Sequence, residues 1–126
     1  MRRPWGGKAV RSFIHGSDVA EATYAIALEA IPGEIFHLAT NEYVSIKDLV
    51  FKICSVMGVD PENATRIVED RPGKDQAYFL NTEKVEKEMG FRPQMNLATG
   101  IQQTIAWIQK NADLFRTKGL NYLHKP

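Results

Sequence analysis

Residues 34–58 read EIFHLATNEYVSIKDLVFKICSVMG, and this stretch indicates the fold class because its periodicity changes along it. Residues 34–40 are mostly apolar on both faces, as expected for a short strand in a sheet that is covered on both sides. Ser45 and Asp48 are then spaced as in a capping box, and apolar residues recur at helical spacing until Gly58. The stretch therefore predicts a strand followed by a helix, and an α/β fold.

The same reasoning predicts the elements on either side. We expect further strands over residues 9–15 and 65–69. The other helices are expected from Asp18, after a Ser17 cap, to about Ala30; from an Asn81 or Thr82 cap to Met89; and from Asn96 to Asn111. Residues 60–63 are expected to form a loop. The prediction is a small mixed sheet of short strands with about four helices.

Small and apolar residues suggest how these helices pack. Four alanines in the first helix, Ala20, Ala22, Ala25 and Ala27, suit close packing on a sheet. In the last helix a stripe of residues is expected to face the core: Leu97, Ile101, Thr104, Ile105 and Ile108. We expect residues 1–111 to form one domain and residues 112–126 to form a C-terminal tail.

Composition excludes several classes of protein. Sixteen basic and fifteen acidic residues are spread evenly, which argues against binding to nucleic acid or to an anionic membrane. No apolar run approaches the roughly 18 residues of a membrane span. The single cysteine, Cys54, cannot form an internal disulfide, lies in an apolar helical pattern and is expected in the core. These features predict a cytoplasmic protein.

One loop has side chains suited to a ligand. It reads Arg71-Pro72-Gly73-Lys74-Asp75 and is followed by Tyr78. Proline and glycine favour a stiff, tight turn, from which Arg71 and Lys74 could bind a phosphate. Asp75 could accept hydrogen bonds from sugar hydroxyls. The alternative is a surface turn in which Arg71 and Asp75 pair in water. Arg11, in the middle of the first strand, has similar alternatives: an edge residue in solvent or a ligand contact.

Other catalytic and cofactor motifs are absent from the sequence. It has no Gly-x-Gly-x-x-Gly, Walker or Gly-x-Ser-x-Gly motif, and its three histidines lack the spacing of a zinc site. Tyr43 and Lys47 match Tyr-x-x-x-Lys, the acid/base pair of short-chain dehydrogenases. That chemistry requires both groups on one helix face, and Tyr43 is expected to precede the helix. No metal site and no catalytic residue are therefore predicted.

Motifs taken in order resemble a known family. They are Arg-Ser-Phe-Ile-His (11–15), Gly-Glu-Ile-Phe-His-Leu (33–38), Ser-Ile-Lys-Asp-Leu-Val (45–50), Arg-Pro-Gly-Lys-Asp (71–75), Gly-Phe-Arg-Pro (90–93) and Thr-Ile-Ala-Trp (104–107). From about Gly7 to Asn111 the chain resembles the C-terminal, substrate-binding part of extended short-chain dehydrogenases that act on nucleotide sugars. The similarity is strongest to dTDP-glucose 4,6-dehydratases.

The resemblance implies a ligand and a set of contacts. Residues matching Arg11 and Arg71 hold the diphosphate of a dTDP- or UDP-sugar in that family, and those matching Asp75 and Tyr78 lie near the nucleoside. Lys74 would add a second charge to the loop. The NAD-binding half and the catalytic Tyr/Lys pair have no match in these residues, so NAD is expected only if a partner chain supplies that half.

Two interpretations remain open at this point. The chain is a nucleotide-sugar-binding domain without catalytic power of its own, or it is an interaction or oligomerisation module that kept the fold and lost the ligand. In both cases an apolar strand edge and helix face would be exposed, and such surfaces are usually covered. We therefore expect a homo-oligomer, or a complex with a chain that carries the NAD-binding half.

Overall fold

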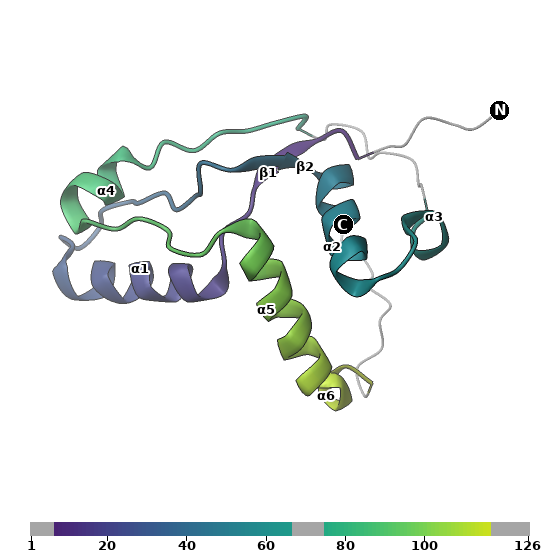
Figure 1. Cartoon of the computed structure of the whole chain (residues 1–126). Coiled ribbons are helices and arrows are strands. Elements are labelled where there is room, and N and C mark those ends of the chain that lie inside the picture. The colour runs from purple at the N-terminus through teal and green to yellow at the C-terminus, as the bar shows by residue number, and fades with distance from the viewer. Residues whose placement is uncertain (1–6, 67–74, 117–126) are drawn as a thin grey trace, which may run out of the picture.

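A computed structural model describes residues 7–66 and 75–116 as a mixed α/β structure (Figure 1). The elements in chain order are β1 (Val10–Ser12), α1 (Gly16–Glu29), β2 (Tyr43–Ser45), α2 (Ile46–Met57), α3 (Pro61–Ala64), α4 (Glu83–Met89), α5 (Leu97–Lys110) and α6 (Ala112–Arg116). All four expected helices are present. Two short helices, α3 and α6, were not expected.

The sheet is small and β1 is its centre. β1 and β2 are antiparallel, and Arg11 lies opposite Val44. On the other side of β1, Val10 forms an isolated parallel bridge with Ala77, and its N–H donates to the Gln76 carbonyl at 2.8 Å. The short strand β1 therefore joins two segments that are far apart in the sequence.

The predicted strand over residues 34–40 is wrong. This segment is extended, but it belongs to no sheet within the described residues. Its contact with β1 runs through a side chain, because the Ser12 hydroxyl accepts the Thr40 N–H at 2.9 Å. An apolar pattern favours a buried strand, but a ladder also needs the backbone of a neighbouring strand. The predicted strand over residues 65–69 lies mostly outside the described residues, and Thr65 and Arg66 are not in a strand.

Helix ends follow their local sequence closely. Ser45 and Asn96 cap α2 and α5 as predicted, and Gly58 and Gly90 end α2 and α4 with φ of 67° and 62°. Two details differ from prediction, at α1 and α3. His15, not Ser17, caps α1, because its Nδ1 accepts the Ser17 N–H at 3.2 Å. For α4, of the two predicted caps, the Asn81 side chain accepts the Glu83 N–H, whereas the Thr82 side chain makes no such bond. Of residues 60–63, predicted as a loop, 61–63 belong to α3, and the Asp60 side chain caps that helix by accepting the Glu62 N–H.

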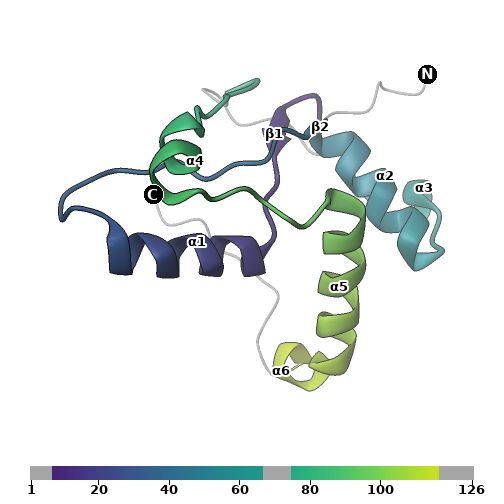
Figure 2. The same cartoon turned by 60° about the vertical axis from the view of Figure 1, so that its left-hand side comes forward.

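A small core lies between α1 and α4, which face one another in Figure 2. Ala22, Val85 and Phe91 are its buried residues, and Phe36 and Leu38 pack against it from the extended segment. Of the four alanines expected to pack closely, only Ala22 is fully buried. Lys84 of α4 forms an ion pair with Glu34 and lies over the Phe36 ring, with Nζ 4.6 Å from the centroid. These contacts hold the extended segment against α4.

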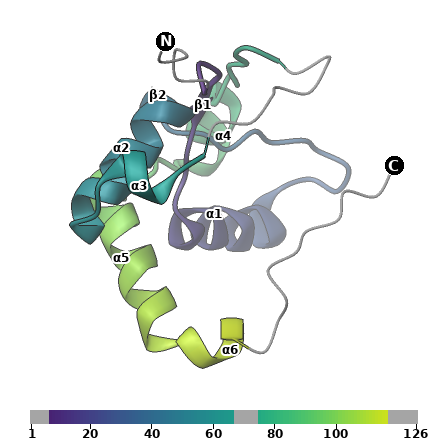
Figure 3. The same ribbon diagram turned by 90° about the vertical axis from the view of Figure 1, so that its right-hand side faces the viewer.

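The helices α2 and α5 form a second unit. Figure 3 shows α5 running away from the sheet, with α6 at its far end. Cys54 is buried, as predicted. The expected core face of α5 is only partly buried: Ile101 is buried, but Thr104 and Ile108 are exposed. An apolar groove of about 350 Å³ lies between the two helices instead. Helical spacing predicted the apolar face correctly, but it could not predict what would cover that face.

Asp18 joins the two parts of the structure. It lies in the first turn of α1, is only 3% exposed, and its carboxylate accepts the N–H groups of Gln94 at 3.2 Å and Met95 at 3.0 Å. These residues immediately precede the Asn96 cap of α5. A single carboxylate therefore satisfies two backbone donors and fixes where α5 begins relative to α1.

We expect Asp18→Ala to lower the free energy of unfolding by about 1–3 kcal/mol, because it leaves two backbone N–H groups without their acceptor. Urea denaturation measures the loss. Glu21→Ala, which removes an exposed carboxylate from the same helix, is the matched control and should change stability little. Equal stabilities of the two variants would contradict the role given to Asp18.

Candidate functional site

Arg11 is held in place by neighbours on two sides. Its Nη1 donates to the Val10 carbonyl at 2.7 Å and its Nη2 donates to the Asp75 carbonyl at 2.8 Å. The carbon at the centre of the guanidinium lies 4.5 Å from the centroid of the Tyr78 ring, within the range of a cation–π contact. A strand residue that points freely into solvent would not make these contacts.

The structure brings three of the five predicted site residues together. Arg11, Asp75 and Tyr78 are in contact, although Asp75 takes part through its backbone carbonyl. Arg71 and Lys74 lie outside the described residues. The contact between Arg11 and Tyr78 was not predicted, and no spacing rule could have found it, because the two residues come from distant segments.

The positive charge of Arg11 has no carboxylate partner within the described residues. The two carbonyls carry only partial negative charges, and a guanidinium has more N–H donors than these two bonds use. The side chain is also only half-buried. The arrangement therefore leaves a fixed cation able to bind an anion.

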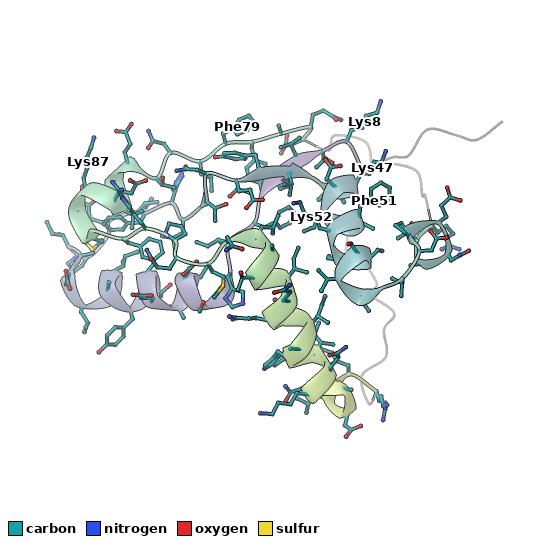
Figure 4. All side chains as sticks on the ribbon, in the orientation of Figure 1. Lys8, Lys47, Phe51, Lys52, Phe79 and Lys87 are labelled. Atoms are coloured by element: carbon teal, nitrogen blue, oxygen red, sulfur yellow. The ribbon has the colours of Figure 1, made fainter. Side chains whose placement is uncertain are left out.

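The residue after Tyr78 makes a separate aromatic contact with β2. Phe79, labelled beside the two strands in Figure 4, packs edge-on against Tyr43 of β2 with ring centroids 4.8 Å apart. Tyr43 thus lies in a strand and Lys47 in α2, which confirms the prediction that they do not share a helix face. The Lys47 ammonium instead lies 5.4 Å from the Phe51 ring centroid.

Other kinds of site find no support in the described part of the chain. Residues 7–66 and 75–116 contain no group of three His, Cys, Asp or Glu side chains able to hold a metal ion. None of the helices described there has both the length and the apolar character needed to span a bilayer.

A pair of charges on α4 shifts the pKa of both members. The hydrogen bond from Lys87 to Glu83, at 2.8 Å, lowers the pKa of Glu83 below its usual 4.5 and raises the pKa of Lys87 above its usual 10.5. The pair therefore stabilises α4 between pH 4.5 and pH 10.5, the ordinary pKa values of the two groups. Its contribution is lost as the pH falls through the folded-state pKa of Glu83, or rises through that of Lys87.

Comparisons with known proteins confirm the resemblance inferred from the motifs. No protein-family model matches the sequence. The dTDP-glucose 4,6-dehydratase of Escherichia coli is 30% identical over 113 residues, which cover 85% of this chain and 31% of that protein. A trifunctional UDP-glucose 4,6-dehydratase/UDP-4-keto-6-deoxy-D-glucose 3,5-epimerase/UDP-4-keto-L-rhamnose-reductase of Arabidopsis thaliana is 33% identical over 107 residues, or 85% of this chain and 16% of that protein.

Solved structures give the same result. The dTDP-glucose 4,6-dehydratase DesIV of Streptomyces venezuelae, with NAD bound, matches with a TM-score of 0.80 and 29% identity over 86% of this chain and 34% of that one. WbmF of Bordetella bronchiseptica, in complex with NAD⁺ and UDP, matches with a TM-score of 0.69 and 31% identity over 88% of this chain and 32% of that one. This chain therefore spans about a third, or less, of the relatives that it matches.

We expect Lys87→Gln to raise the pKa of Glu83 back toward 4.5, because the variant loses the charge and the strong hydrogen bond. The pKa is measured by following the Glu83 carboxyl carbon by NMR across an acid titration. Lys110→Gln, on α5, is the control and should leave the titration unchanged. A Glu83 titration that is identical in the wild-type chain and in Lys87→Gln would show that the ion pair does not form in solution.

Proposed function

We propose that this chain, a relative of the dTDP-glucose 4,6-dehydratases and similar NAD-dependent nucleotide-sugar enzymes, is a nucleotide-sugar-binding domain in which Arg11 contacts the diphosphate. The supporting observation is a cation fixed beside Tyr78 and residue 75 without a carboxylate partner in the described residues. Arg11 and Tyr78 are also among the residues to which the family resemblance assigns this ligand.

The chemistry of a nucleoside diphosphate suits these residues. Arg11 offers charged N–H donors, and Arg71 and Lys74, which lie outside the described residues, would add a second cationic group from the loop before Asp75. The Asp75 side chain is exposed and would accept hydrogen bonds from sugar hydroxyls. In this proposal a dTDP- or UDP-hexose lies across the end of β1, with its phosphates on the arginines.

Catalysis, in this proposal, requires a second polypeptide segment. Hydride transfer in relatives that work with NAD needs a bound nicotinamide. The 126 residues contain no glycine-rich dinucleotide motif, and Tyr43 and Lys47 do not form an acid/base pair. The chain alone therefore binds a nucleotide sugar without converting it, and NAD-dependent turnover by the purified chain would contradict this part of the proposal.

The exposed apolar surface supports a role for a partner. Ile31 and Ile35, which flank the start of the extended segment, are 73% and 72% exposed. Residues 35–39 form no backbone hydrogen bonds to other described residues. An extended segment with unpaired backbone groups and exposed apolar side chains favours pairing with another chain, as an exposed strand edge does. We propose that a second copy, or a chain carrying an NAD-binding half, covers it.

We expect UDP and dTDP to bind the purified chain in calorimetric titration, and Arg11→Ala and Arg71→Ala to weaken binding at least about tenfold, because each removes a charge-assisted hydrogen bond. Arg92→Ala is the matched control, since Arg92 is exposed and pairs with Glu86. Absence of binding at millimolar ligand, or unchanged binding by Arg11→Ala, would contradict the proposal. It would favour the alternative, an interaction module that lost its ligand.

We expect the purified chain to self-associate at micromolar concentration and Ile35→Asp to shift it toward monomer, because the charge would be buried in the contact. Light scattering coupled to gel filtration measures the mass. Val59→Asp, an exposed position after α2, is the control for general effects of an added charge. A wild-type chain that is a clean monomer would exclude self-association through this surface.

A further inference from the structure

We infer that Tyr78 is a positioning residue: its ring holds the Arg11 guanidinium in the orientation that receives the diphosphate. This inference rests on the proposed function and adds a role that the resemblance does not assign to Tyr78, which the resemblance places only near the nucleoside. It also states which part of the side chain matters. The ring face acts, and the hydroxyl does not.

The backbone fixes Tyr78 relative to Arg11. Val10, the neighbour of Arg11, bridges in parallel to Ala77, the neighbour of Tyr78. The Val10 N–H also donates to the Gln76 carbonyl. Two chain segments joined at adjacent residues leave little freedom in how the next side chains meet. The backbone pairing of β1 therefore places the ring beside the guanidinium.

The three contacts of Arg11 involve different parts of its guanidinium group. Two edges of the guanidinium donate to the carbonyls of Val10 and Asp75, and one face lies against the Tyr78 ring. A long arginine side chain loses rotamer freedom when it binds a ligand, and this cost lowers affinity unless the side chain is already held. Removing the ring would release one of the constraints that hold it.

Among the described residues, the Tyr78 side chain forms no hydrogen bond, ion pair or ring contact besides the one with Arg11. It is 52% exposed, lies outside the buried core, and its hydroxyl forms no hydrogen bond to any described residue. Because only the ring of Tyr78 contacts the cation, phenylalanine at this position should hold Arg11 equally well. A leucine would fill similar space without the ring electrons that attract the cation.

The test uses Tyr78→Phe and Tyr78→Leu, with Phe79→Leu as the matched control on the adjacent, also exposed ring. Two properties are measured on the full chain: the affinity for UDP by calorimetry, and the NMR shift of the Arg11 Nε–Hε group, which a nearby ring moves upfield. Thermal unfolding of each variant verifies that the fold is retained.

We expect Tyr78→Phe and Phe79→Leu to keep both the wild-type affinity and the Arg11 shift. Tyr78→Leu should weaken UDP binding on the order of threefold to tenfold and abolish the ring-induced shift. If the wild-type chain does not bind UDP, the proposed function is wrong, and the Arg11 shift alone decides whether Tyr78 holds the guanidinium. The inference is overturned if Tyr78→Leu keeps the shift or the affinity, or if Tyr78→Phe loses as much affinity as Tyr78→Leu.

Discussion

The backbone pairing of β1 is the constraint on which the rest of the structure depends. Val10 lies between Ser45 and Ala77, so one residue joins the start of α2 to the segment that carries Asp75 and Tyr78. The same connection continues before Val10 in the chain. The Ala9 carbonyl accepts the Ile46 N–H, and the Gly7 carbonyl accepts the Lys47 N–H, both at 3.0 Å. Three short stretches, distant in sequence, are thereby held side by side, and the candidate site lies on them.

Helix ends, which depend on neighbouring residues, could be predicted from the sequence, whereas contacts between distant segments could not. Ser45, Asn96, Gly58 and Gly90 define helix ends through bonds within a few residues, so their roles followed from their positions. The strand over residues 34–40 failed because pairing depends on a neighbour that no local pattern supplies. The apolar face of α5 was predicted from helical spacing. Which segment covers that face was not predicted, since this depends on the surrounding structure.

The candidate site, too, could be predicted only in part from the sequence. Residues alone suggested an anion-binding loop at 71–75 and left Arg11 undecided between solvent and ligand. The resemblance joined Arg11 to that loop, and the structure places its guanidinium on the Asp75 carbonyl and the Tyr78 ring. A cation–π contact requires two side chains that face one another. Sequence spacing predicts such a pair only within one helix, or between strands whose pairing is known. Here the pairing of β1 was itself unknown.

The proposed ligand site and the exposed apolar surfaces lie on different parts of this structure. The exposed apolar residues Ile31 and Ile35 lie on the segment that follows α1, and the apolar groove lies between α2 and α5. Arg11 and Tyr78 are held by the bonds of β1, which involve neither surface. A partner that covers the apolar surfaces would stabilise the fold, but the orientation of Arg11 does not require it. Because the cation is fixed from within the chain, the proposed diphosphate binding would not depend on the partner that catalysis would require.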